Sequence, residues 1–358
     1  MRWDALRASD SGEEGPGQPG MPALFERGAV ARTFDTPGFR GMTFFEVHAR
    51  SVINRVPDAS RVPFRWTINP YRGCSHSCVY CFARNTHVYL DFDAGHDFDS
   101  KIVVKVNAPE RVRQELGSAR WRGEPIAMGT NVDCYQRAEG RYRLMPGILA
   151  ALRDYANPFS ILTKGTLILR DLELLQEAAE VTDVGLAVSV GCTDPGLWRV
   201  LEPGTPSPQR RLEACATFGR HGLPCAVLMG PIVPFLSDSP AQLDATVRQI
   251  AQAGATSVTP IVLHLRTGAR EWFFRWLGEH HPALVPRYRE LYGHGAYAPR
   301  AYQQRVAGQV HELAQRHRVG QGSPRARSSH RNPARPPGAP MARACPGAPG
   351  SPVQLALL

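Results

Sequence analysis

The chain has 358 residues, of which 43% are hydrophobic and 21% charged, a composition typical of a globular protein with one large catalytic domain or two small ones. No apolar run reaches the roughly 18 residues that a membrane-spanning helix needs. The net charge is +10, but six arginines from Arg318 onward lie in a stretch without Asp or Glu, and subtracting them from +10 leaves +4. The charge is therefore weak support for a nucleic-acid partner.

The two ends of the chain differ in composition from its middle. Residues 1–37 carry a polar run and several Gly and Pro, and residues 319–358 are rich in Pro, Gly, Ser, Ala and Arg. We expect both ends to be disordered and the folded domain, with a C-terminal helical extension, to cover residues 38–318. The first seven residues have no apolar core after their first charges, so we expect no secretory signal and a cytoplasmic location.

Short apolar runs recur between these ends, and most are followed by a segment with helical spacing. They predict strands over residues 64–68, 125–128, 160–163, 184–190, 225–229 and 257–262. The intervals suit helices over 144–156 and 209–221 and a third helix that Asp171 caps. A fourth begins with Ser239 as N-cap and Pro240 in its first turn, and it ends at Gly254.

Six strands that alternate with helices predict parallel βα units and an α/β fold. Six units are too few for a closed eight-stranded barrel, so we expect a partial (β/α)6 TIM-like barrel. A doubly wound open sheet is the alternative, but no G-x-G-x-x-G motif follows the first strand. In such a barrel the reactive groups gather at the carboxyl ends of the strands.

Three of the eight cysteines, Cys74, Cys78 and Cys81, form a C-x3-C-x2-C run after the first predicted strand. So short a run folds as one loop, and its thiolates can converge on a single inorganic centre. A structural zinc site takes four ligands, and a four-iron cluster closed by protein alone takes four cysteines. The triplet leaves one iron open to a small molecule. Cys192, Cys215 and Cys225 lie in or beside apolar stretches, and we expect them to be buried small hydrophobes.

This run, with Tyr80 before its last cysteine, resembles the cluster loop of the radical S-adenosylmethionine (SAM) superfamily. The flanking residues, Asn69 to Gly73 and Phe82 to Arg84, resemble the branch that includes spore photoproduct lyase and the DNA repair photolyases, and an actinobacterial-type subgroup is most similar, over residues 41–300. The resemblance implies the partial barrel, a [4Fe-4S] cluster on the three cysteines and SAM on the open iron, with Tyr80 near the adenine. It also implies an external reductant such as flavodoxin or ferredoxin.

The same resemblance implies SAM contacts at other strand ends. The second strand end usually supplies acceptors for the SAM amino group through a Gly-Gly-Glu-like segment. Met128-Gly129-Thr130 departs from that pattern, so the acceptor is expected from the backbone, Asp133 or Glu139. Ligand contacts in the branch map onto Lys164 and Ser189, at the third and fourth strand ends. The alternative interpretation is that neither residue contacts a ligand: Lys164 is then a solvated turn lysine, and Ser189 hydrogen-bonds to nearby backbone.

Other residues allow two interpretations. Cys134 is either a hydrogen donor, like the cysteine that spore photoproduct lyase uses near its second strand, or a partly buried spectator thiol, which we favour. His264-Leu265-Arg266 and the aromatic residues of 272–276 either stack on nucleobases or pack a terminal helix against the barrel, and we favour packing. We expect His76 to face solvent rather than to bind iron.

The sequence thus predicts a radical SAM enzyme, of lyase or oxidoreductase type, that cleaves SAM reductively to a 5′-deoxyadenosyl radical and abstracts hydrogen from an unidentified substrate. A DNA lesion is a candidate by resemblance, and with it a nucleic-acid partner. One alternative is an iron–sulfur protein that senses redox state or transfers electrons without substrate chemistry. Another is a structural zinc protein that recruits its fourth ligand from elsewhere in the chain.

Overall fold

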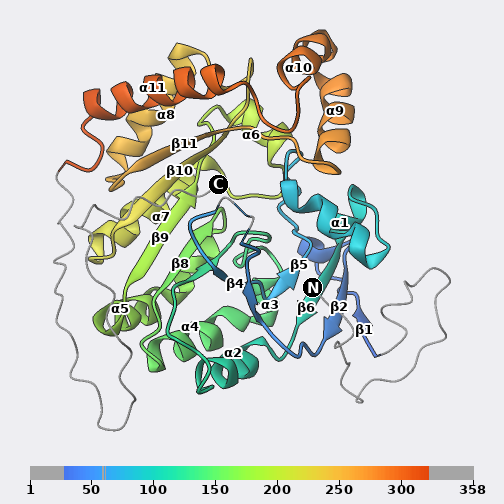
Figure 1. Cartoon of the computed structure of the whole chain (residues 1–358), viewed down its shortest axis with the longest axis vertical. Helices are drawn as coiled ribbons and strands as arrows, with labels where there is room; N and C mark the ends of the chain where they lie inside the picture. Colours follow the sequence, from blue (N-terminus) through green and yellow to red (C-terminus); the bar gives the residue numbers. More distant parts are fainter. Residues whose placement is uncertain (1–27, 59, 61, 322–358) are drawn as a thin grey trace.

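The computed structural model describes residues 28–58, 60 and 62–321, and its larger sheet is the predicted partial barrel (Figure 1). The strand order is β11-β10-β9-β8-β7-β4-β3. The six strands from β4 to β11 are parallel, and β3 joins one edge antiparallel to β4. The bounds are β3 Ile53–Arg55, β4 Trp66–Ile68, β7 Ile126–Met128, β8 Phe159–Thr163, β9 Val184–Ser189, β10 Cys225–Ile232 and β11 Val258–Val262. All six predicted strands are confirmed.

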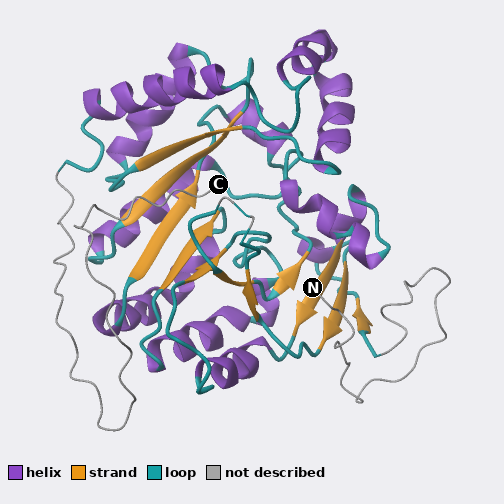
Figure 2. Cartoon of the chain, in the orientation of Figure 1, coloured by secondary structure: helices purple, strands orange, loops and turns teal. Residues whose placement is uncertain are grey.

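The connections between the parallel strands are largely helical (Figure 2). Ser239 caps its helix by accepting from the Gln242 N–H at 3.3 Å, as predicted. Asp171 stands at an N-cap position, but its carboxylate accepts from Arg170 and Tyr135 instead of from the helix backbone. The helices that follow barrel strands are α2 Ala108–Leu116, α3 Glu139–Tyr142, α4 Leu144–Asp154, α5 Leu172–Val181, α6 Pro195–Leu201, α7 Pro208–Arg220 and α8 Pro240–Gln252.

A second sheet, which the sequence analysis did not predict, has the order β1-β2-β6-β5. Its bounds are β1 Val30–Arg32, β2 Thr43–Val47, β5 Tyr71–Arg72 and β6 Lys101–Lys105, and the pair β2–β6 is parallel. β5 follows β4 with two residues between them, so the C-x3-C-x2-C loop starts where the two sheets meet. The short helix α1, His96–Ser100, leads into β6.

The predicted disordered segment 1–37 was too long at its C-terminal end. Residues 30–32 form β1, and Phe34 packs against Phe39 and Phe44, with the Arg141 guanidinium 3.6 Å from its ring centre. Aromatic burial and strand pairing therefore extend the folded part to residue 28. The rest of that segment, residues 1–27, lies outside the described residues, as do residues 322–358 of the predicted tail. Val319 packs against the core at the start of that tail.

The C-terminal helices α9 Ala269–His280, α10 Val285–Leu291 and α11 Arg300–Arg316 complete the fold. Phe273 is fully buried and Trp276 nearly so, in one hydrophobic cluster with Val79 and Tyr80 of the cysteine loop. The packing interpretation of these aromatic residues is confirmed. Across the part of the chain placed by the structure, no helix has the length and apolarity needed to cross a bilayer.

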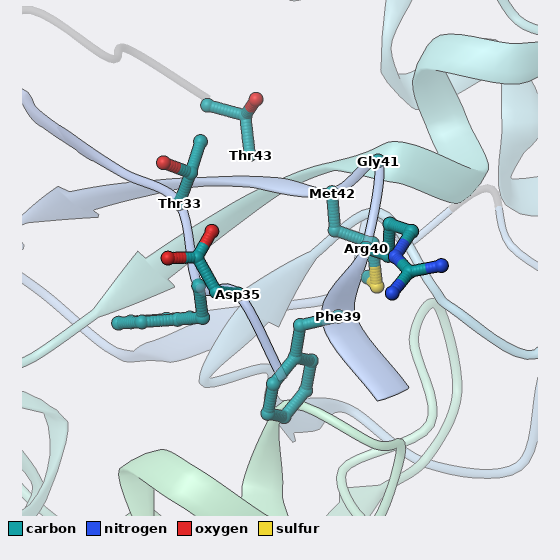
Figure 3. Close-up of a pocket in the computed structure, with 8 residues that line it drawn as sticks. Thr33, Asp35, Phe39, Arg40, Gly41, Met42 and Thr43 are labelled. Atoms are coloured by element: carbon teal, nitrogen blue, oxygen red, sulfur yellow. The ribbon is translucent and has the colours of Figure 1, made fainter. Parts of the chain in front are cut away.

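The second sheet carries a cavity of about 420 Å³ between β1 and β2, shown in Figure 3. It is lined by residues 33–35 and 39–43, among them the charged pair Asp35 and Arg40. None of the lining residues belongs to a barrel strand or to the cysteine loop. This cavity is therefore separate from the strand ends at which the sequence places the chemistry.

Candidate active site

The C-x3-C-x2-C loop follows β5 and ends at the short 3-10 helix η2, Phe82–Thr86. Cys74 and Cys78 are buried, Cys81 is partly buried, and all three are free thiols. Gly73, which starts the loop, has φ +82°, and a Cβ on it would lie 2.9 Å from both the His87 ring and the Lys101 carbonyl oxygen. Only glycine fits there. The loop is thus packed closely against the segment that leads into β6.

Two residues without a local sequence signal hold the loop from outside. The Gln136 side chain accepts from the Ser75 N–H and donates to the Gly73 carbonyl, both at 2.9 Å. The Gly204 N–H donates to the His76 carbonyl at 3.1 Å, and a Cβ on Gly204 would lie 2.1 Å from the Ser75 carbonyl oxygen. The connection from β7 to α3 and the connection from α6 to α7 therefore both hold the loop in place.

The buried Arg84 holds the loop through the backbone carbonyl of its second cysteine, Cys78. Its Nε and Nη2 donate to the Cys78 carbonyl at 3.2 and 3.0 Å, and Nη2 also donates to the Asp99 carboxylate at 2.9 Å. The guanidinium lies 4.8 Å from the centre of the Trp272 ring. Burial raises the pKa of Asp99 to about 6 against the lowering effect of Arg84. A buried charge is tolerated when it is paired and hydrogen-bonded in this way.

Three thiols on one loop are a donor set that fits an iron–sulfur cluster. Burial raises the pKa of all three thiols, to about 12 for Cys78, where the Lys164 charge acts in the opposite direction. Within residues 28–321, apart from 59 and 61, no three His, Cys, Asp or Glu side chains form a group that could hold one metal ion. A four-iron cluster takes one thiolate on each of several irons, so its ligands are spread apart. The structural zinc alternative stays a prediction, which the metal content of the isolated protein tests.

Lys164 and Ser189, predicted from two different strand ends, come together beside the cysteine loop. The Lys164 Nζ donates to the Ser189 Oγ at 2.8 Å and lies 5.8 Å from the centre of the Tyr80 ring. Ser189 is buried, and its hydroxyl donates to the Gly230 carbonyl at 2.9 Å. The third predicted contact, Tyr80, is buried as well. The contact of these three residues with SAM stays a prediction.

Two charged residues that the sequence analysis missed complete a polar network with them. The Tyr80 hydroxyl and the Arg211 guanidinium both donate to the Glu202 carboxylate. The Arg211 Nη1 donates to the Ser189 carbonyl at 2.9 Å. Hydrogen bonds therefore connect five residues one after another, in the order Tyr80, Glu202, Arg211, Ser189 and Lys164. Burial raises the pKa of Glu202, but Arg211 and Lys164 outweigh it and hold that pKa below its ordinary value. Glu202 is thus an anion inside the protein.

Asp133 joins three segments instead of offering a free carboxylate. One oxygen accepts from the Tyr135 N–H at 2.9 Å and the Thr163 hydroxyl at 2.6 Å, and the other accepts from the Lys164 N–H at 2.7 Å. His76 Nδ1 lies 3.4 Å from that second oxygen. Burial raises the pKa of Asp133, but His76 and these hydrogen bonds hold it well below its usual range. His76 is 4% exposed, so the prediction that it faces solvent was wrong: Asp133 holds it inside.

Glu139 is fully buried and serves the start of α4. Its carboxylate accepts from the Leu144 N–H at 3.0 Å, the Met145 N–H at 3.1 Å and the Arg170 guanidinium at 2.6 Å. The Tyr71 hydroxyl donates to it too. Four protein donors thus account for a carboxylate that was predicted as a SAM contact, and we do not retain Glu139 in the proposed site.

Two buried acceptors at neighbouring strand ends have no hydrogen-bond partner among the residues that the structure describes. They are Asn69 Oδ1, directly after β4, and Thr130 Oγ1, two residues after β7. Gly129, between β7 and Thr130, has φ +80°, and a Cβ there would lie 1.8 Å from the Leu162 carbonyl oxygen. Because buried polar atoms are normally paired, these two acceptors are open to an ammonium group. Unpaired atoms leave no sequence signal.

The remaining cysteines of the described chain are buried. Cys192, Cys215 and Cys225 are each 8% exposed or less, which confirms the prediction of small buried hydrophobes. Cys134 is fully buried, and burial raises the pKa of its thiol well above the ordinary value. This environment agrees with the spectator interpretation of Cys134. Cys345 lies outside the described residues.

Known proteins resemble this chain over the region that contains the cysteine loop. A family model described as the Radical SAM superfamily matches residues 68–250, which is more than half of the chain and includes all three loop cysteines. "Uncharacterized protein Rv2578c" of Mycobacterium tuberculosis (strain ATCC 25618 / H37Rv) is 49% identical over 319 residues, covering 89% of this chain and 93% of that protein. "Uncharacterized protein MJ0683" of Methanocaldococcus jannaschii is 30% identical over 195 residues, covering 54% and 69%.

Solved structures show the same fold at low identity. Spore photoproduct lyase complexed with dinucleoside spore photoproduct matches with a TM-score of 0.57 at 14% identity, covering 77% of this chain and 80% of that one. A double mutant of that lyase with bound AdoMet and the dinucleoside gives a TM-score of 0.55 at 14% identity, covering 74% and 77%. This likeness concerns the path of the chain.

Proposed function

The chain belongs to the radical SAM superfamily, and on that premise we propose that Cys74, Cys78 and Cys81 hold a [4Fe-4S] cluster whose open iron binds SAM. Membership makes the protein an enzyme that depends on SAM, on an iron–sulfur cluster and on an external reductant. When bound and reduced, these cofactors supply reductive cleavage of SAM to a 5′-deoxyadenosyl radical, which abstracts hydrogen from a substrate. The protein's own residues bind and orient the groups involved.

The observation that carries this proposal is the meeting of Lys164, Ser189 and Tyr80 beside the three thiols of the loop. The carboxylate of a zwitterion takes a cation, which Lys164 provides, and the Ser189 hydroxyl orients that ammonium group by accepting from it. Its ammonium group takes oxygen acceptors, and the unpaired Asn69 Oδ1 and Thr130 Oγ1 are such acceptors. The family resemblance puts Tyr80 near the adenine, and the hydrogen bond to Glu202 fixes the position of its ring.

The electron donor and the substrate are part of this proposal too. We propose flavodoxin or ferredoxin as the external reductant, because the family's chemistry needs a low-potential electron donor. The cytoplasmic location stays a prediction from the sequence. A DNA lesion is the substrate that the resemblance suggests, and the solved lyase structures that share the fold contain a dinucleoside. At 14% identity that likeness carries the fold and not the substrate, which needs evidence from this chain's own surface.

The test is anaerobic purification, reconstitution with iron and sulfide, reduction with dithionite and measurement of 5′-deoxyadenosine formed from SAM. We expect product from the wild type and none from Cys78→Ala, whose iron content should also fall. A fully loaded protein that forms no product beside a working control enzyme would overturn SAM cleavage and favour the redox-sensing alternative. Zinc in place of iron after anaerobic isolation would favour the structural alternative.

A further inference from the structure

Three rings and one guanidinium form a continuous row, from the residue after the last loop cysteine to the surface near β11. Phe82 follows Cys81 directly, and its ring centre lies 5.6 Å from that of His264. The His264 ring stacks on Tyr297, with centres 5.5 Å apart and planes 24° from parallel. The Arg266 guanidinium lies 5.6 Å from the centre of the Phe82 ring and donates to the Tyr297 hydroxyl at 3.1 Å. We refer to these four residues as the aromatic row.

Backbone contacts bring the three segments of the aromatic row together. His264 and Tyr297 form an isolated antiparallel bridge, and the Leu265 N–H donates to the Ala296 carbonyl at 2.7 Å. Gly268 approaches η2 so closely that a Cβ on it would lie 2.9 Å from the Asn85 side chain. α9 starts immediately after Gly268, beside the segment that follows the cysteine loop (Figure 1). The row is therefore a rigid feature at the carboxyl end of the barrel.

The outer part of the row is exposed, which internal packing does not explain. Tyr297 is 46% exposed and Arg266 is exposed, whereas the nearby aromatic residues Phe273 and Tyr288 are fully buried. In the described part of the chain, the Arg266 guanidinium interacts with the Tyr297 hydroxyl and the Phe82 ring, and neither of these neutralises its charge. Burial, with help from Arg266, lowers the pKa of His264 to about 4, so this ring is neutral at pH 7. The row thus presents ring faces and one positive charge.

We propose that the aromatic row binds single-stranded nucleic acid, with an unpaired base on Tyr297 and a neighbouring phosphate at Arg266, and leads the strand towards the cysteine loop at Phe82. Bases stack on aromatic faces whatever their identity, and a guanidinium pairs with phosphate. A duplex keeps its base faces inside the stack, so only an unpaired base can meet these rings. This inference names the substrate class and rests on the proposed function for the reaction that follows binding. The binding itself does not depend on SAM cleavage.

The test is fluorescence anisotropy of a short labelled oligothymidine with the reconstituted protein under anaerobic conditions, next to the same sequence as a duplex. We expect the single strand to bind more tightly. Tyr297→Ala should weaken binding about 5- to 150-fold, the usual effect of removing one stacking ring. Arg266→Gln should reduce the slope of log affinity against log salt by about 0.7, the share of one phosphate contact on a single strand.

The matched control is Tyr155→Ala, which removes an equally exposed tyrosine (44%) from the end of α4, and its affinity should equal that of the wild type. Equal binding by wild type and Tyr297→Ala would overturn the inference, and so would competition by inorganic polyphosphate as strong as that by unlabelled oligothymidine. The 5′-deoxyadenosine assay on the same preparation separates the two proposals. If the cluster-loaded protein cleaves SAM but binds no single strand, only the proposal that the aromatic row binds nucleic acid is overturned. If it binds the strand without cleaving SAM, only the proposed function is overturned.

Discussion

The Lys164 ammonium donates a 2.8 Å hydrogen bond to the Ser189 hydroxyl, and this contact links the carboxyl ends of β8 and β9 beside the cysteine loop. The Ser189 hydroxyl in turn donates a hydrogen bond to the Gly230 carbonyl on β10. Three neighbouring strands are thereby joined through one hydroxyl. A negative group that enters next to Tyr80 meets a cation that is already oriented, so little side-chain ordering remains to be done on binding.

Lys164→Met should weaken SAM binding about 10- to 150-fold, because a hydrogen bond to a charged group contributes roughly 1.5–3 kcal/mol. Equilibrium dialysis with the reconstituted protein measures this affinity. Iron content should stay at the wild-type level, since Lys164 is not a thiolate ligand. Lys101→Met is the control, because Lys101 pairs with Asp97 on the surface of the second sheet. Full affinity in a fully loaded Lys164→Met protein would remove Lys164 from the SAM site.

Glu202→Gln should destabilise the fold by about 3–5 kcal/mol, because it leaves the buried Arg211 guanidinium without its counter-charge. Urea unfolding measures the loss. The double variant Glu202→Gln with Arg211→Met removes both charges and should recover part of the stability. A double variant whose loss equals the sum of the two single losses would contradict a direct coupling between Glu202 and Arg211.

Asp133→Asn should show a stability loss that depends on pH. The folded-state pKa of Asp133 is held below its unfolded value of about 4, since His76, Thr163 and the Lys164 N–H outweigh the effect of burial. The stabilising contribution is therefore fully present above pH 4 and is lost as the pH falls through the folded-state pKa. Urea unfolding at pH 7 and below pH 4 should show a large gap between variant and wild type that narrows in acid. A gap of constant size would contradict this assignment.

Gly204→Ala should displace the cysteine loop, because the new methyl group would lie 2.1 Å from the Ser75 carbonyl oxygen. We expect poor iron uptake on reconstitution and an unchanged far-ultraviolet circular dichroism spectrum. Gly219→Ala in α7 is the matched control, since the structure places no atom within 4 Å of its added methyl group, and alanine favours a helix by about 1 kcal/mol. Wild-type iron content in Gly204→Ala would show that the loop tolerates the displacement.

The barrel could be predicted from local patterns because each parallel strand is a short apolar run with a helix after it. Cys225–Ile232 and Val258–Val262 were found in this way within a few residues. The second sheet was missed although β6, Lys101–Lys105, has the valines of a strand. Its partner β2 lies more than 50 residues earlier, and no crossover helix separates β5 from the barrel strand before it. Pairing over such a distance leaves no periodicity in a short window.

The candidate site divides in the same way. The cysteine spacing identified the loop, and the strand ends identified Lys164 and Ser189, because both depend on positions along the chain. Glu202 and Arg211 were missed because a charged residue at the end of a helix or on it is usually solvated, and only the packed fold shows that these two are buried together. Glu139 was chosen for its charge and place, yet four protein donors surround it. The sequence shows which polar side chains are present, and the packed fold decides which of them are left without hydrogen-bond partners in the protein.

The contacts of Arg84 bear on what happens to the cysteine loop when oxygen destroys an iron–sulfur cluster. The guanidinium that holds the Cys78 carbonyl has the Asp99 carboxylate as another partner, and both partners belong to the protein. We therefore expect these contacts within the protein to hold the loop at Cys78 when no iron is bound. When oxygen destroys the iron–sulfur cluster, we expect the cysteine loop to keep its conformation. Repair in the cell would then need iron and sulfide but no refolding of the chain.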